Sequence, residues 1–66
     1  MKWQAKVTEM GTHWFQTEDC NRSVVPDNGH WRGTASIPRG NGRDAHVEVS
    51  PQFATAMEAK RWAETL

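Results

Sequence analysis

Several features that mark secreted and membrane proteins are scarce in this 66-residue sequence. Its single cysteine, Cys20, cannot form an intramolecular disulfide and is therefore typical of a chain kept in a reducing compartment. No apolar run approaches the ~20 residues of a membrane-spanning helix, and no apolar stretch follows Met1 that would act as a secretory signal. We therefore expect a soluble cytoplasmic protein of bacterial type with no membrane partner.

The sequence also carries no net charge, because eight Lys and Arg residues balance eight Asp and Glu residues. It thus lacks the strongly basic balance that marks most nucleic-acid-binding domains. The charge is unevenly spread, since residues 30–43 hold three arginines and no acidic residue. A single basic segment in the middle of a neutral chain is the one electrostatic feature to explain.

The length of the chain limits its core. Residues 1–66 form one small domain, and a chain of this size buries only about 60% of the surface that it exposes when unfolded. The four tryptophans compensate in part, because each can bury ~150–250 Å². A homodimer would be a natural way to enlarge so thin a core.

The clearest element in the sequence is a helix in the last fourteen residues, FATAMEAKRWAETL. Thr55 and Glu58 have the spacing of a capping box. Counting 100° per residue places one apolar stripe along the segment, formed by Ala56, Ala59, Ala63 and Leu66 with Trp62 at its edge. A second start, with Ser50 as the cap and Pro51 as the first helical residue, is compatible with the sequence, but Thr55 has the support of two residue types.

The rest of the chain is typical of short strands, because polar and apolar residues alternate in it. Residues 2–8, 30–37 and 44–50 alternate most regularly, and 13–17 is a shorter candidate. The side chains expected to face inward are Trp3, Ala5, Val7, Trp31, Gly33, Ala35, Ile37, Ala45, Val47 and Val49, with His46 and Glu48 outward. Residues 18–29 are mostly turn-formers, in which Val24 and Val25 could pair briefly at a sheet edge before a turn at 26–29.

These segments predict an α+β fold, in which a three- to four-stranded antiparallel sheet is packed on one face by a single C-terminal helix. Residues 30–37 and 44–50 are predicted to form a hairpin closed by a six-residue loop.

No metal, cofactor or catalytic site is indicated. The possible soft or imidazole ligands are His13, Cys20, His30 and His46, and none of them shows a paired spacing such as CxxC or HxxxH. His30 and His46 could meet only across the outer face of the hairpin. Nucleophile-elbow and Walker patterns are absent, and a domain this small has little room for the ~300 Å³ cavity typical of a small-molecule site. We expect a protein that is not an enzyme.

The outward side of the sheet is the first candidate binding surface. The side chains predicted to lie there are Lys2, Gln4, Lys6, Thr8, His30, Arg32, Thr34 and Ser36, with Arg39 and Arg43 in the adjoining loop. These residue types contact phosphates and base edges, although any solvated face of an antiparallel sheet is polar. No aromatic side chain is predicted on this surface for a base to stack on.

A second candidate surface involves Trp14 and Phe15. Because neighbouring residues of a strand point to opposite faces, one of the two must point outward. Aromatic side chains are enriched in the cores of protein interfaces, so the outward ring could contact a protein partner or a second copy of the chain. Packing of both rings within the domain is the alternative.

The C-terminal pattern F-x-T-x-x-E-A-x-x-W is formed by Phe53, Thr55, Glu58, Ala59 and Trp62. It resembles a class of short uncharacterised proteobacterial proteins built as three strands followed by a helix. It is also similar to the arm-binding domain of phage-type integrases and to the plant ethylene-response DNA-binding domain. The resemblance covers residues 30–66 and implies a three-stranded sheet backed by a helix, a fold that reads the major groove of DNA in those two families. The present chain departs from them in lacking their excess of basic residues.

Two functional hypotheses follow. The first is a small non-enzymatic binding module that acts through protein–protein contacts, including those of a homodimer. The alternative is nucleic-acid binding through the solvent-exposed face of the sheet.

Overall fold

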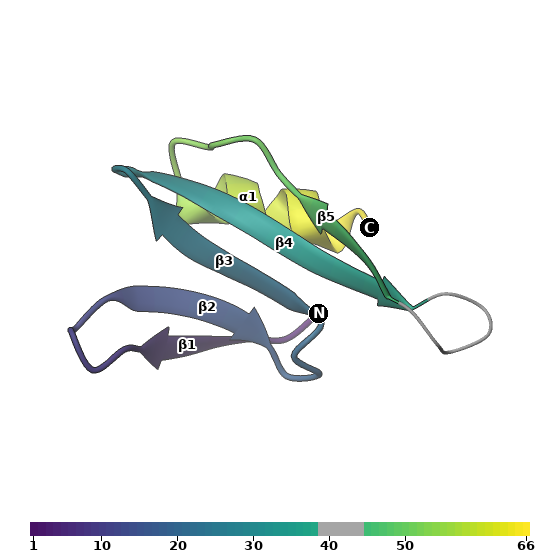
Figure 1. The fold of residues 1–66 in the computed structure, drawn as a ribbon, viewed down its shortest axis with the longest axis horizontal. Helices are drawn as coiled ribbons and strands as arrows, with labels where there is room; N and C mark the ends of the chain where they lie inside the picture. Colours follow the sequence, from purple (N-terminus) through teal and green to yellow (C-terminus); the bar gives the residue numbers. More distant parts are fainter. Residues whose placement is uncertain (39–44) are drawn as a thin grey trace.

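The structure is a computed structural model that describes residues 1–38 and 45–66. Arg39 and Arg43 of the predicted loop lie outside the described residues. The elements are β1 (Trp3–Val7), β2 (His13–Thr17), β3 (Arg22–Asp27), β4 (His30–Pro38), β5 (Ala45–Val49) and α1 (Ala56–Glu64). The strands form one antiparallel sheet in the order β1-β2-β3-β4-β5, and α1 packs on β3 and β4 (Figure 1). The α+β prediction is confirmed, with five strands in place of three or four. We call the side covered by α1 the helix face and the opposite side the open face.

Strand β3 lies where the sequence predicts mostly turn, in residues 18–29, and that prediction is wrong. Six of them form a strand that pairs with both β2 and β4, and Val24 at its centre is fully buried. The chain then reverses at Asn28 and Gly29, which both have positive φ. This conformation is that of a type I′ turn, which asparagine followed by glycine adopts more readily than other pairs. Asp27 consequently pairs with His30 and sets the register of β3 against β4.

Helix α1 begins where the capping pattern predicts. The Thr55 hydroxyl accepts from the backbone N–H of Glu58 at 3.2 Å and donates to the Glu58 carboxylate at 3.0 Å. Ala59 and Ala63 are fully buried and lie against the sheet. The second possible cap, Ser50, has another role that is described below, so the helix starts at Ala56.

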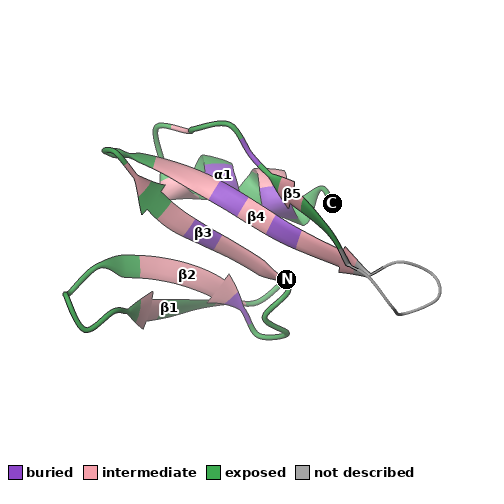
Figure 2. Cartoon of the chain, viewed as in Figure 1, coloured by how far each residue is buried: buried purple, intermediate pink, exposed green. Residues whose placement is uncertain are grey.

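The helix sits close to the sheet because Gly33 lies beneath it. A Cβ atom at Gly33 would lie 3.0 Å from Cε3 of the Trp62 ring and 3.1 Å from the carbonyl oxygen of Ala59. Arg22 of β3 also binds the helix, since its Nε donates to the carbonyl oxygen of Ala63 at 2.9 Å. The fully buried apolar side chains of the described residues are therefore small ones: Val24, Ala35, Ala59 and Ala63 (Figure 2).

Aromatic side chains surround this small core on the helix face. Phe15 and Trp31 have ring centroids 5.9 Å apart, and Trp31 exchanges two backbone hydrogen bonds with Phe53 just before the helix. The Lys60 ammonium lies 3.8 Å from the Phe15 ring centroid, a cation–π contact. Trp3 is also tied to α1, because its indole Nε1 donates to Glu64 at 2.8 Å. The expected inward positions of Trp3 and Trp31 are confirmed.

The sequence predicts that Val47 and Val49 of β5 face inward, and this prediction is wrong. Thr34 pairs with Val49 and Ser36 with Val47, so both valines lie on the open face, where they are 51% and 59% exposed. The cause is Ser50, which is buried on the helix face, where its hydroxyl accepts from the Gly33 N–H at 2.7 Å. Because side chains alternate along a strand, fixing Ser50 inward turns Val49 and Val47 outward.

The same alternation places His46 and Glu48, which were expected to face outward, on the helix face opposite Ile37 and Ala35. Their side chains pair with each other there. In the part of the chain that the structure describes, no helix is long and apolar enough to cross a membrane.

Candidate functional site

The open face of the sheet carries the best candidate site, and its side chains form rows across the strands. Cross-strand pairing defines a central polar row, Gln4–Gln16–Ser23–Thr34–Val49. One pleat away lies a second row, Lys6–Trp14–Val25–Arg32, in which Lys6 pairs with Trp14 and Val25 with Arg32. Val47 extends the apolar end of the surface along β5.

Most of the residues predicted for this surface lie on it. Gln4, Lys6, Arg32 and Thr34 point to the open face by their registers, and His30 lies at the start of β4 on the same side. Lys2 precedes β1, beside a separate hollow. Arg39 and Arg43 are outside the described residues.

The prediction that Trp14 and Phe15 point to opposite faces is confirmed. Phe15 pairs with Val24 and lies on the helix face, whereas Trp14 lies on the open face and is half-buried. This placement also puts Trp14 beside Lys6 on the polar surface, where no aromatic side chain was predicted for a base to stack on. Val25, Val47 and Val49 also belong to the surface and were missed, because β3 was not recognised as a full strand and β5 was given the wrong facing.

Much of the positive charge of the surface is already compensated. Arg32 Nε donates to Asp27 at 2.9 Å, and Arg32 also donates to the backbone carbonyl of Ser50 at 3.3 Å. The hydrogen bond from the Gln52 amide, and after it the one from Arg32, lowers the pKa of the Asp27 carboxyl from its ordinary value of 3.8. Asp27 is therefore ionised at neutral pH and neutralises Arg32.

The polar row consists of groups that both donate and accept hydrogen bonds. The Ser23 and Thr34 hydroxyls are 2.5 Å apart and bond to each other across β3 and β4. The Gln4 and Gln16 side chains carry an amide donor and a carbonyl acceptor each. Such a row can meet another uncharged polar surface without an unpaired ion.

A hollow opens in the surface where β2 and β3 diverge. Pairing between these strands ends at Phe15 and Val24. Alternate residues of β3 direct their backbone groups towards β2, and Pro26 is the next of these after Val24. Its partner on β4, Trp31, directs its own backbone N–H and C=O to Phe53, so Pro26 and Trp31 do not bond to each other. Proline has no N–H to donate, so the ladder stops. The resulting hollow measures about 300 Å³ and is lined by Thr8, Thr12, Trp14, Val25 and Pro26.

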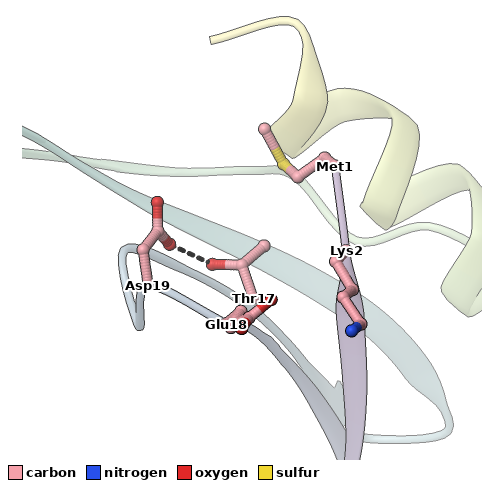
Figure 3. A pocket seen from close by; sticks show the side chains of 5 residues that line it. All are labelled: Met1, Lys2, Thr17, Glu18 and Asp19. Carbon is pink, nitrogen blue, oxygen red and sulfur yellow. Dashed lines mark hydrogen bonds between the residues drawn. The ribbon is translucent and has the colours of Figure 1, made fainter.

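A second hollow, of about 360 Å³, lies between the start of β1 and the turn after β2 (Figure 3). Its polar groups already hold that turn together, since Asp19 accepts from the Thr17 hydroxyl at 2.7 Å and from the Asn21 N–H at 3.0 Å. These bonds, the Thr17 hydroxyl first, lower the pKa of the Asp19 carboxyl. Thr17 and Asp19 therefore already have hydrogen-bond partners within the turn.

The histidines do not converge. His30 lies at the Asp27 end of β4, whereas His46 pairs with Ile37 near the other end and on the opposite face. The suggestion that they could meet across the hairpin is therefore wrong. Within residues 1–38 and 45–66, no three His, Cys, Asp or Glu side chains are grouped to hold a metal ion.

Comparisons with protein-family models, with curated proteins and with solved structures each found no match.

Proposed function

We propose that this chain is a small non-enzymatic binding module, acting in the cytoplasm, whose open face is a contact surface for a protein. The observation that carries the proposal is the group of apolar side chains on that face, Trp14, Val25, Val47 and Val49. The helix leaves them uncovered. Val47 and Val49 pair with Ser36 and Thr34, whereas Trp14 and Val25 pair with Lys6 and with Arg32, whose charge Asp27 neutralises. Interface cores combine aromatic and apolar side chains with a low density of charge.

The charge of the open face supports the same proposal. The ionisable side chains of its described strand residues are Lys6, Asp27, His30 and Arg32. Arg32 is neutralised by Asp27, so Lys6 carries the remaining full charge of the strands at neutral pH. A surface of this kind suits a partner of low charge better than a polyanion.

The test is a photo-cross-linking amino acid placed at Val49 in cells that express the protein. Val7 provides a matched control, because it is 59% exposed against 51% for Val49 and lies on the helix face of β1. We expect position 49, and not position 7, to cross-link to protein. Equal yields at the two positions, or cross-links from position 49 to nucleic acid, would contradict the proposal.

Nucleic-acid binding is a second candidate, and the specific observation in its favour is the pairing of Trp14 with Lys6 on the open face. An aromatic ring beside a cation can stack on a base while the cation contacts a phosphate. This function predicts that Lys6→Ala and Arg32→Ala weaken binding and reduce its salt dependence. A titration with single-stranded and duplex DNA at low salt decides it: unchanged chemical shifts would exclude this alternative.

A further inference from the structure

We infer that the partner of the open face is a second copy of this chain, bound open face to open face. The inference rests on the proposed function and adds the identity of the partner and the way in which the two surfaces meet. Three features of the described residues support it: the small size of the core, the area of the face and its balance of charge.

The core of one copy is small for the number of large side chains in the chain. Among the described residues, the buried apolar side chains are one valine and three alanines. The four tryptophans are all only partly buried. Many domains of this length fold alone, but a small core gains stability from disulfides, metals or association. The described residues form no metal cluster, and the one cysteine is free, so of these three devices association is the one that they leave open.

The open face is large enough for a stable interface. The molecule measures 37 Å and 24 Å along its two longer axes, and Figure 1 looks down the shortest axis, with α1 behind β4. A standard interface takes ~800 Å² from each partner. The open face can supply ~800 Å² only if most of the sheet takes part in the interface. A face-to-face pair therefore fits the surface better than a partner that touches one edge.

The charges of the face are compatible with their own copy. Arg32 and Asp27 neutralise each other within one chain, so two faces meet without opposing rows of like charge. Hydroxyl and amide side chains both donate and accept, so the row Gln4–Gln16–Ser23–Thr34 can bond to the same row of another copy. The surface is thus self-complementary in its polar groups, as a two-fold interface requires.

Within the open face, the apolar groups form two clusters towards opposite edges of the sheet. Trp14 and Val25 flank the hollow between β2 and β3, whereas Val49 and Val47 lie on β5 at the far edge. A two-fold axis lying between the two sheets can bring Val49 of one copy against the Trp14 hollow of the other, and the reverse contact then forms by symmetry. The proposed dimer fills both hollows and covers the exposed valines in one arrangement.

The oligomeric state of the purified full chain tests the proposal. Light scattering after gel filtration, from about 1 µM to about 1 mM, spans tight to weak dissociation constants. We expect a dimer, and we expect Val49→Arg to raise its dissociation constant by more than about tenfold, because the interface would bury an unpaired charge. Val7→Arg is the control and should leave the dimer intact, since Val7 lies on the helix face.

Circular dichroism and thermal unfolding check that each variant folds. If Val49→Arg does not fold, Val47→Arg takes its place. A wild-type chain that is monomeric up to the highest concentration would overturn the proposal. Equal loss of the dimer in Val7→Arg and Val49→Arg would do the same.

Cysteine cross-linking tests the arrangement itself, in a Cys20→Ser background. Chains carrying Trp14→Cys are mixed with chains carrying Val49→Cys and oxidised gently. We expect mixed disulfides to exceed those between identical chains, whereas a preference for identical pairs would refute the arrangement. Gln16→Cys, beside Trp14 on the same strand, serves if Trp14→Cys does not fold. A monomeric chain that still cross-links to another protein from position 49 would remove the dimer and leave the proposed function standing.

Discussion

The close approach of α1 to the sheet predicts that Gly33→Ala destabilises the protein. Glycine is usually a poor residue in the middle of a strand, because it adds unfolded-state entropy and packs no side chain. Gly33 lies in the nine-residue strand β4, and its φ is not positive. Substitution by alanine would therefore be expected to stabilise an ordinary strand. Here the new methyl group would lie 3.0 Å from the Trp62 ring and 3.1 Å from the Ala59 carbonyl oxygen, which is closer than van der Waals contact.

The magnitude follows from two opposing effects. Overpacking a tight site costs about 1–3 kcal/mol, and the entropy gained by replacing glycine offsets about 0.4–1 kcal/mol of it. We expect a net loss of roughly 1 kcal/mol, within the range of about 0–2.6 kcal/mol that these two effects allow. In a domain of 60–100 residues each 1 kcal/mol lowers the melting temperature by about 4–8 °C.

Thermal and urea unfolding of Gly33→Ala, Trp62→Leu and the double variant measure the effect. Because the smaller leucine gives the new methyl group room, the cost of Gly33→Ala should shrink in the Trp62→Leu background. Gly11→Ala is the control: no atom lies within 4 Å of its added Cβ, and its φ is +86°. Its cost comes from the backbone alone and should not depend on residue 62. A stabilising Gly33→Ala, or a cost that Trp62→Leu leaves unchanged, would refute the close packing of α1 on β4.

Three further predictions follow from single contacts. Ser50→Ala should cost about 1–3 kcal/mol in urea unfolding, because the buried Gly33 N–H loses its acceptor. Thr55→Ala should cost about 1 kcal/mol and reduce the helical circular dichroism signal, because α1 loses its N-cap. Stability should fall as pH drops below the ordinary Asp27 pKa of 3.8, because that pKa is lowered in the folded state. Protonation of Asp27 removes its hydrogen bonds from Gln52 and Arg32. Thermal melts of Asp27→Asn should show a smaller loss of stability over the same pH range.

The sequence patterns that located the helix and the strands 3–7, 13–17 and 30–38 are local. A capping box, an alanine stripe and a two-residue alternation each depend on neighbours within one element. These local patterns did not predict strand β3, because Pro26 and the polar residues around Val24 are typical of turns. Its pairing with β4 depends on the Asn28-Gly29 turn, and its pairing with β2 ends before Pro26 would have to donate. The Asn28-Gly29 pair is itself a local hairpin signal, whereas the pairing with β2 involves a strand that a local pattern does not include.

The facing of β5 illustrates a different limit. Alternation shows that Val47 and Val49 share a face, but it does not show which face, and hydrophobicity alone favours the interior. The deciding contact joins Ser50 to Gly33, 17 residues apart in sequence. The same limit applies to the candidate surface: Gln4, Lys6 and Arg32 were predicted from alternation, whereas the positions of its valines follow only from the register.

The proportions of the fold explain why apolar side chains remain on the surface at all. A helix of nine residues is about 13.5 Å long and, with side chains, ~10–12 Å wide, whereas strands are spaced ~4.8 Å apart. One such helix covers little more than two strands, and α1 accordingly packs on β3 and β4 of a five-stranded sheet. On the helix face, Lys60 and Glu64 extend this cover to Phe15 and Trp3 of the outer strands. The open face has no second helix, so Trp14, Val25, Val47 and Val49 stay uncovered within the described chain. The proposed dimer would cover them, because a second copy presents the same broad, largely uncharged sheet face.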